Sequence, residues 1–170
     1  MANALQATFG EGHNELVQLL MDIGVDSKVL AQGGEYGTAL QVACLSENKE
    51  LAEMLLERDA DVNARGGQYG NALQAASIWG NKELVELLLE RGADVNAQGG
   101  YYGNALQAAC VDGTWELVEL LLERGADVHA QGGKYGNALQ AAKDCGHDKV
   151  VQLLLERGAD TNTSTQTVQY

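Results

Sequence analysis

The sequence predicts an all-α solenoid in which helix-turn-helix units stack side by side, joined by hairpin-like loops. The stretch YGNALQAA occurs at residues 69–76, 102–109 and 135–142, and a related copy, YGTALQVA, precedes them by the same 33 residues. Each 33-residue interval contains two short helical patterns, and neither helix would be stable alone in water. Because such units bury their apolar faces only against their neighbours, a fixed period of this length indicates a stacked array.

We expect five consecutive units followed by a short polar tail, all within a single domain of residues 1–170. The units lie near residues 3–37, 38–70, 71–103, 104–136 and 137–162, and the tail at 163–170. The first unit is a degenerate copy that begins NALQAT.

The third unit shows why a first helix is expected over residues 72–78. Asn71 can cap this helix, because its side-chain oxygen can accept hydrogen bonds from free backbone amides one turn on. Gly80 ends the helix. Its leucine, Leu73, recurs as Leu40, Leu106 and Leu139, which predicts a repeated core position.

A second helix is expected over residues 81–91. Its leucines are spaced for one apolar face, its glutamates for a solvated one, and Gly92 supplies the left-handed residue that stops it. The remaining ADVNAQGGYYG is rich in glycine, which predicts an extended excursion with a tight turn. Tyrosines recur in register within these loops and are expected to form a ladder: Tyr36, Tyr69, Tyr102 and Tyr135.

The second unit departs from this pattern. Glu47 and Asp59 stand where the third unit has Gly80 and Gly92, so two helix ends lose the residue that best tolerates a positive φ. We expect this second unit to unfold locally before the other units do.

Composition narrows the class of protein. The formal net charge of −13 argues against a nucleic-acid partner, because phosphate binding needs a basic stripe. No apolar run approaches the roughly 18 residues that span a bilayer, and the N-terminus does not read as a signal peptide. We therefore expect a cytoplasmic protein that binds neither nucleic acid nor membrane.

No set of residues predicts catalysis, a cofactor or a metal. The three histidines do not cluster, no glycine-rich loop precedes a lysine for phosphate, and serine, histidine and carboxylate do not recur at the spacing of a triad. The odd cysteines, Cys44, Cys110 and Cys145, include no CxxC pair and are expected to be small buried or half-buried thiols.

Each unit resembles the ankyrin repeat. The ankyrin pattern T-P-L-H-x-A-A, then G-H, then V-x-x-L-L-x-x-G-A-D-V-N lies over NALQAAS, GN and VELLLERGADVN within residues 71–96, and the likeness covers about residues 3–162. Alanine replaces the family's proline and glutamine its histidine. The resemblance implies that glutamine takes over some of the histidine hydrogen bonds between loops.

The resemblance also implies a function. It indicates a non-catalytic protein–protein interaction module in which loop tips and the ends of first helices line one concave face. The GGxYGNALQAA form of the repeat is similar to the repeat tails of fungal NACHT-type immune receptors, which implies the ligand-sensing region of a larger receptor.

The differences between units indicate where a partner binds. The third and fourth units agree at 26 of 33 positions, and five of the seven differences fall between SIWGNK at 77–82 and CVDGTW at 110–115. Tryptophan at a usually polar site exposes apolar area, and Trp and Tyr are frequent binding hot spots. We expect Trp79, Tyr101 and Trp115 to be anchors. Around them we expect Ile78, Val111, Asp112, Glu35, Gln68 and Lys134.

Four alternatives stay open. The variable positions could reflect drift at exposed sites, and the glutamates of the second helices could dock a basic partner. The last helix keeps an apolar face, KVVQLLLE at residues 149–156, so the array could self-associate end to end, or be a structural array or designed scaffold with no natural partner. The segments LLERGADVN and LLERDADVN resemble the substrate motif of ankyrin-directed asparaginyl hydroxylases, which points to Asn63 and Asn96.

Overall fold

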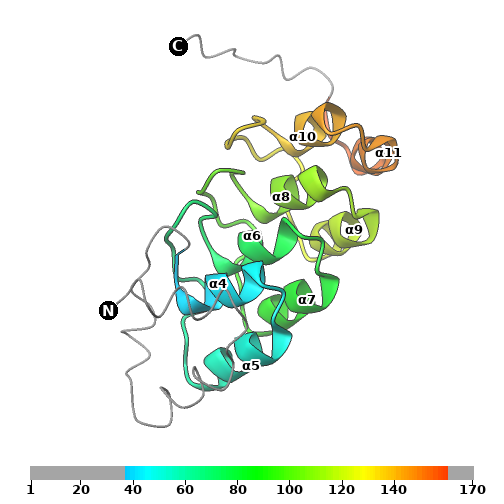
Figure 1. The fold of residues 1–170 in the computed structure, drawn as a ribbon. Helices are drawn as coiled ribbons and strands as arrows, with labels where there is room; N and C mark the ends of the chain where they lie inside the picture. The colour runs from blue at the N-terminus through cyan, green and yellow to red at the C-terminus, as the bar shows by residue number, and fades with distance from the viewer. Residues whose placement is uncertain (1–36, 161–170) are drawn as a thin grey trace, which may run out of the picture.

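The structure is a computed structural model that describes residues 37–160 of the 170-residue chain (Figure 1). Within these residues the chain forms consecutive helix pairs and no strand beyond isolated bridges. The helices are α4 (Ala39–Leu45), α5 (Lys49–Glu57), α6 (Ala72–Ser77), α7 (Lys82–Glu90), α8 (Ala105–Asp112), α9 (Trp115–Glu123), α10 (Ala138–Asp144) and α11 (Asp148–Glu156). The predicted all-α helical repeat solenoid is confirmed.

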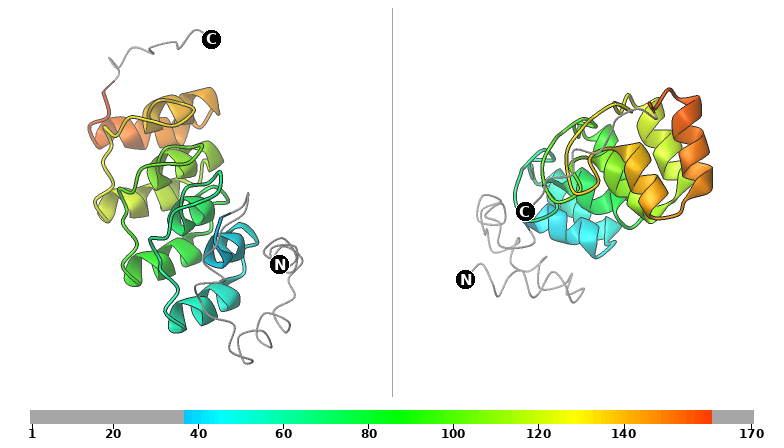
Figure 2. Two further views of the ribbon diagram at one scale, coloured as in Figure 1. Left: turned by 90° about the vertical axis from the view of Figure 1, so that its left-hand side faces the viewer. Right: turned by 90° about the horizontal axis from the view of Figure 1, so that it is seen from above.

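The helices form two layers. Helices α4, α6, α8 and α10 pack side by side, and each packs against the second helix of its own pair. The second helices form the outer layer, and the long loops project on the opposite side of the first helices (Figures 1 and 2). Most of the predicted first unit, residues 3–36, lies outside the described residues.

Capping side chains fix where the first helices begin. The Asn71 side chain accepts a hydrogen bond from the Gln74 backbone N–H at 2.9 Å, and Thr38, Asn104 and Asn137 do the same in their units. Asn81 caps α7 in the same way, so this helix begins one residue later than the sequence predicts. Gly92 follows α7 with a φ of 87°, as its left-handed role requires.

The repeated leucine is a core position in every described unit. Leu40, Leu73, Leu106 and Leu139 are all buried, together with the alanines of the first helices. Because alanine is small, neighbouring first helices approach closely, and the leucines of the second helices fill the space behind them.

Glutamine side chains join successive units, as the family resemblance implies. The side-chain amide of Gln41 donates to the Gly66 carbonyl at 3.0 Å, and that of Gln74 donates to the Ala97 carbonyl at 3.0 Å. Gln107 repeats this contact with the Ala130 carbonyl at 3.3 Å. These bonds hold each first helix to the loop that precedes the next one. The loops are hairpin-like, with isolated bridges at Gly66–Gly70, Gly99–Gly103 and Gly132–Gly136.

The three cysteines are free thiols and are buried or half-buried, as the sequence predicts. Cys44 and Cys110 are buried and Cys145 is half-buried. Burial raises the pKa of Cys44 to about 12 and raises that of Cys110 as well, so both stay neutral in the folded protein. No helix within residues 37–160 is long and apolar enough to cross a membrane.

Glu47 and Asp59 adopt positive φ angles of 53° and 61°, the non-glycine residues among those described that do so. A left-handed residue other than glycine costs about 1–2 kcal/mol, and somewhat less for Asp. We therefore expect Asp59→Gly to raise the free energy of unfolding by about 0.5–1 kcal/mol, measured by urea denaturation.

The matched control is Gly92→Asp, which puts the same residue at the equivalent helix end of the next unit and should lower stability by a similar amount. Native-state hydrogen exchange should show faster exchange in α4 and α5 than in α6 and α7. Uniform protection from α4 to α11 would contradict this account of the second unit.

Candidate functional site

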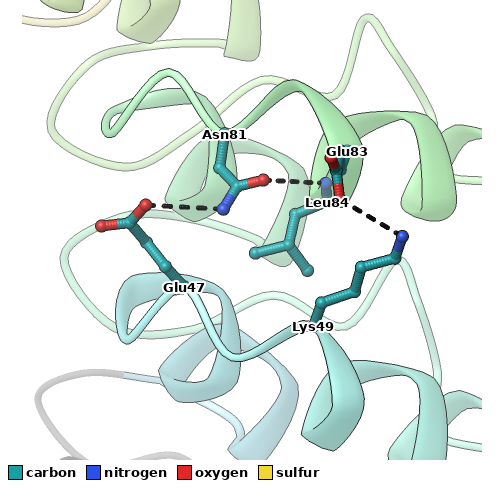
Figure 3. Close-up of polar contacts among 5 residues, drawn as sticks. All are labelled: Glu47, Lys49, Asn81, Glu83 and Leu84. Carbon is teal, nitrogen blue, oxygen red and sulfur yellow. Dashed lines mark hydrogen bonds and ion pairs between the residues drawn. The ribbon is translucent and has the colours of Figure 1, made fainter.

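The turns between the two helices of each pair contact one another along the array. We call residues 44–49, 77–82, 110–115 and 143–148 the turn row. The Asn81 side-chain amide donates to the Glu47 carboxylate at 3.5 Å, and Lys49 forms an ion pair with Glu83 at 3.4 Å (Figure 3).

The turn row continues through the later units. An added Cβ on Gly80 would stand 2.5 Å from the Thr114 hydroxyl oxygen, which shows how closely the second and third of these turns approach. His147 Nε2 lies 3.0 Å from the Val111 carbonyl oxygen and donates to it in the tautomer protonated at Nε2. The variable positions of successive units are therefore spatial neighbours.

The loop tips form a second contiguous surface. We call residues 64–70, 97–103 and 130–136 the loop row. The Tyr101 N–H donates to the Gln68 carbonyl at 2.7 Å, and the Lys134 N–H donates to the Tyr101 carbonyl at 2.9 Å. The rings of Tyr69 and Tyr102 stack with centroids 6.4 Å apart, which is one step of the predicted tyrosine ladder. Tyr36 lies outside the described residues.

The two rows lie at opposite ends of the first helices, since a loop precedes each first helix and a turn follows it. The six residues of α6 span about 9 Å. All of these six side chains are buried, so the exposed variable side chains stand on the rows and not on the helix between them.

Trp79 and Tyr101 are the predicted anchors that reach solvent. Trp79, in the turn row, is 54% exposed, and Tyr101, in the loop row, is 49% exposed. Apart from Leu155, they are the exposed large hydrophobic side chains within residues 37–160. Exposing so much aromatic surface is costly in water, which is the property expected of anchors.

Trp115 occupies a different environment. It is the first residue of α9, is half-buried, and packs against the core cluster. The Lys149 ammonium of α11 lies 3.7 Å from the centroid of its ring, in a cation–π contact that joins the last two units. Part of the Trp115 surface is therefore already used within the protein.

The residues predicted around the anchors divide by burial. Ile78 is only 9% exposed and can contribute little surface, while Val111 and Asp112 are half-buried in the turn row. Gln68 and Lys134 are exposed in the loop row. Glu35 lies outside the described residues.

Tyr102 and Tyr135 were expected only as members of the ladder, yet they adjoin the exposed groups of the loop row. The Tyr102 ring meets the Tyr101 ring edge to face at 5.0 Å, and the Lys134 ammonium lies 5.1 Å from the Tyr135 ring centroid. In the sequence, these contacts could have been predicted from the adjacent tyrosines at 101 and 102 and from the adjacent lysine and tyrosine at 134 and 135.

The C-terminal end of the array exposes apolar side chains whose equivalents in the inner units are covered by the next unit. Leu155 is 41% exposed, and Val151 is half-buried where the equivalent Val85 and Val118 are fully buried. A cavity of about 300 Å³ also lies near this end, with Val128 among its lining residues.

A charged side chain stands on the same end. Lys143 is exposed at the position where Cys44, Ser77 and Cys110 are fully buried against the following unit. Stacking an identical unit here would bury this ammonium, at a considerable cost. This end is therefore only partly suited to another repeat.

Asn63 and Asn96 each clamp the following unit. The Asn63 side-chain amide donates to the Gly92 carbonyl at 3.0 Å, while its oxygen accepts from the Asp94 N–H at 2.8 Å. Asn96 makes the equivalent bonds to Gly125 and Asp127. Their hydroxylation stays a prediction.

Across residues 37–160, no group of three or more His, Cys, Asp or Glu side chains could hold a metal ion.

Comparison with known proteins assigns the repeats. A family model described as ankyrin repeats (3 copies) matches residues 4–99 and again residues 98–165, which together are nearly the whole chain. A search of curated proteins with this sequence finds no match. The repeated helix pairs, the glycine-rich loops and this match agree, and the chain belongs to the ankyrin repeat family.

Proposed function

We propose that the chain is a non-catalytic module that binds a partner protein across the turn row and the loop row, which together border its concave face. In this proposal it acts in the cytoplasm as the ligand-sensing repeat region of a larger receptor. Ankyrin repeats are generally protein–protein interaction modules, which supports the class of function.

The observation that carries the proposal is the exposure of Trp79 and Tyr101. The leucines and alanines of the core cluster are packed inside the array, whereas these two aromatic side chains stand in solvent on the two rows. The turn row is also where most differences between the third and fourth units fall. A constant scaffold with variable side chains on contiguous rows is the geometry of a repeat-protein binding surface.

Affinity capture from a cell extract tests the proposal with three immobilised proteins. These are the wild type, a Trp79→Ala/Tyr101→Ala variant, and a Glu90→Ala/Glu123→Ala control on exposed positions of the outer helices. Truncating two anchors is expected to weaken binding of the captured protein at least about tenfold, while the control binds like the wild type.

All three proteins must first show the same helical circular dichroism spectrum. Equal capture by the wild type and the anchor variant would place the interface elsewhere, and a loss confined to the glutamate variant would favour an acidic docking site. Adding Trp115→Ala should have a smaller effect than either anchor, because Lys149 already covers its ring.

A second candidate function is end-to-end self-association through α11, favoured by the exposure of Leu155. Sedimentation equilibrium would then give a mass that increases with concentration, and Leu155→Glu would abolish the increase. A constant monomer mass over the whole concentration range would exclude this candidate.

A further inference from the structure

The loop row holds a preorganised cluster of one ammonium and several aromatic rings. The Lys134 ammonium lies 5.3 Å from the Tyr101 ring centroid and 5.1 Å from that of Tyr135. Tyr101 in turn contacts Tyr102 edge to face, and Tyr102 stacks on Tyr69. The backbone bond from Lys134 to the Tyr101 carbonyl fixes the two loop tips relative to each other.

Lys134 differs from Lys49 and Lys82 in what it contacts. Lys49 pairs with Glu83 at 3.4 Å and Lys82 with Glu86 at 3.9 Å, so these charges are matched within the protein. Among the described residues no carboxylate forms an ion pair with Lys134, and its side chain is exposed. Its positive charge is held in place and is available to a partner.

Unlike the turn row, the loop row contains no acidic side chain. The loop tips at residues 64–70, 97–103 and 130–136 contain Arg65 and Lys134 and no Asp or Glu, in a chain whose formal net charge is −13. A carboxylate of a partner would be repelled by the glutamates of the outer helices and attracted by the cationic side chains of the loop tips.

We propose that the loop row binds an acidic peptide segment of the partner protein, in which a carboxylate pairs with Lys134 and a neighbouring apolar or aromatic side chain packs on Tyr101 and Tyr102. This proposal rests on the proposed function and names the chemistry of its partner. Because the tyrosine rings already restrict the lysine side chain, less conformational entropy is lost when the ion pair forms.

The charge of Lys134 is secure at physiological pH. Hydrogen bonding and charge interaction with Tyr101, followed by interaction with Tyr135, raise the lysine pKa. A nucleic acid fits the site less well, because the loop row offers only Arg65 and Lys134 as cations in a chain whose formal net charge is −13.

Selection from a phage-displayed library of random dodecapeptides tests the proposal. The wild-type chain is the target, with no counter-selection against any variant, so that peptides that do not need Lys134 are also recovered. Enriched peptides are expected to contain Asp or Glu beside an aromatic or aliphatic residue.

Synthetic copies of the selected peptides are then titrated by fluorescence anisotropy against the wild type and three variants. Binding should weaken about tenfold with Lys134→Gln, be largely retained with Lys134→Arg, and be unchanged with Arg124→Gln, which removes an exposed cation at the C-terminal cap of α9. It should also weaken as salt is raised.

Failure to enrich any peptide, enrichment of Lys- and Arg-rich peptides, or equal binding by wild type and Lys134→Gln would each overturn the proposal. Peptides that require Trp79 and are indifferent to Lys134 would overturn it while leaving the proposed function intact. Loss of partner capture with the anchor variant, measured separately, tests that function independently.

Discussion

Leu106→Ala is expected to lower the free energy of unfolding by about 2–5 kcal/mol. Leu106 is 1% exposed in the first turn of α8, where the array packs on both sides of the helix. Removing its side chain takes away buried apolar contact and leaves a cavity that the rigid neighbouring helices can fill only in part. Thermal unfolding should show a decrease in melting temperature of roughly 5–15 °C.

The control for this prediction is Leu155→Ala. It makes the same chemical change at a leucine that is 41% exposed at the end of the array, and should cost less than about 1 kcal/mol. Equal effects of the two substitutions, or a Leu106→Ala melting temperature within one or two degrees of wild type, would contradict the core assignment.

Gly133→Ala is expected to cost about 2–4 kcal/mol by adding backbone strain and a steric clash. Gly133 has a φ of 64°, and a Cβ at this position would overlap the Tyr102 carbonyl group and stand 2.5 Å from the Gly103 nitrogen. Since these atoms belong to the backbone of the neighbouring loop, no side-chain rotation can relieve the overlap. The two loops must separate, which would also displace Lys134 from Tyr101.

Gly125→Ala is a control that adds the backbone strain of a positive φ without the steric clash expected at Gly133. Gly125 has a similarly positive φ of 89°, but among the described residues no atom lies within 4 Å of its added Cβ. It should cost only the backbone term, about 1 kcal/mol. If urea denaturation gave the same loss for both glycines, the close packing of adjacent loop tips would be wrong.

Local features of the fold were predictable because their causes lie within a few residues. Asn71 caps a helix through the Gln74 N–H, and Gly92 ends one through its own φ. The strained residues Glu47 and Asp59 were also identifiable, because the period aligns them with glycines of the next unit. Position within a repeat therefore carries backbone information that single-residue propensity does not.

The surface was less predictable, because burial there depends on contacts between units. Trp115 and Trp79 look equally exposed in the sequence, yet Lys149, one unit later, covers only the former. Ile78 adjoins Trp79 and is nevertheless buried. The contact between Lys134 and Tyr101 joins identical positions of consecutive units, so it arises from stacking and from the one-residue differences between repeats.

The most direct test of the central claim is a hydrogen-exchange footprint of the chain with its captured protein bound. We predict slower exchange in the turn row at residues 77–82 and 110–115 and in the loop row at 97–103 and 130–136, with α7 and α9 beyond their first residues unchanged. Slower exchange confined to the outer helices or to α11, with both rows unaffected, would contradict the claim that these rows bind the partner.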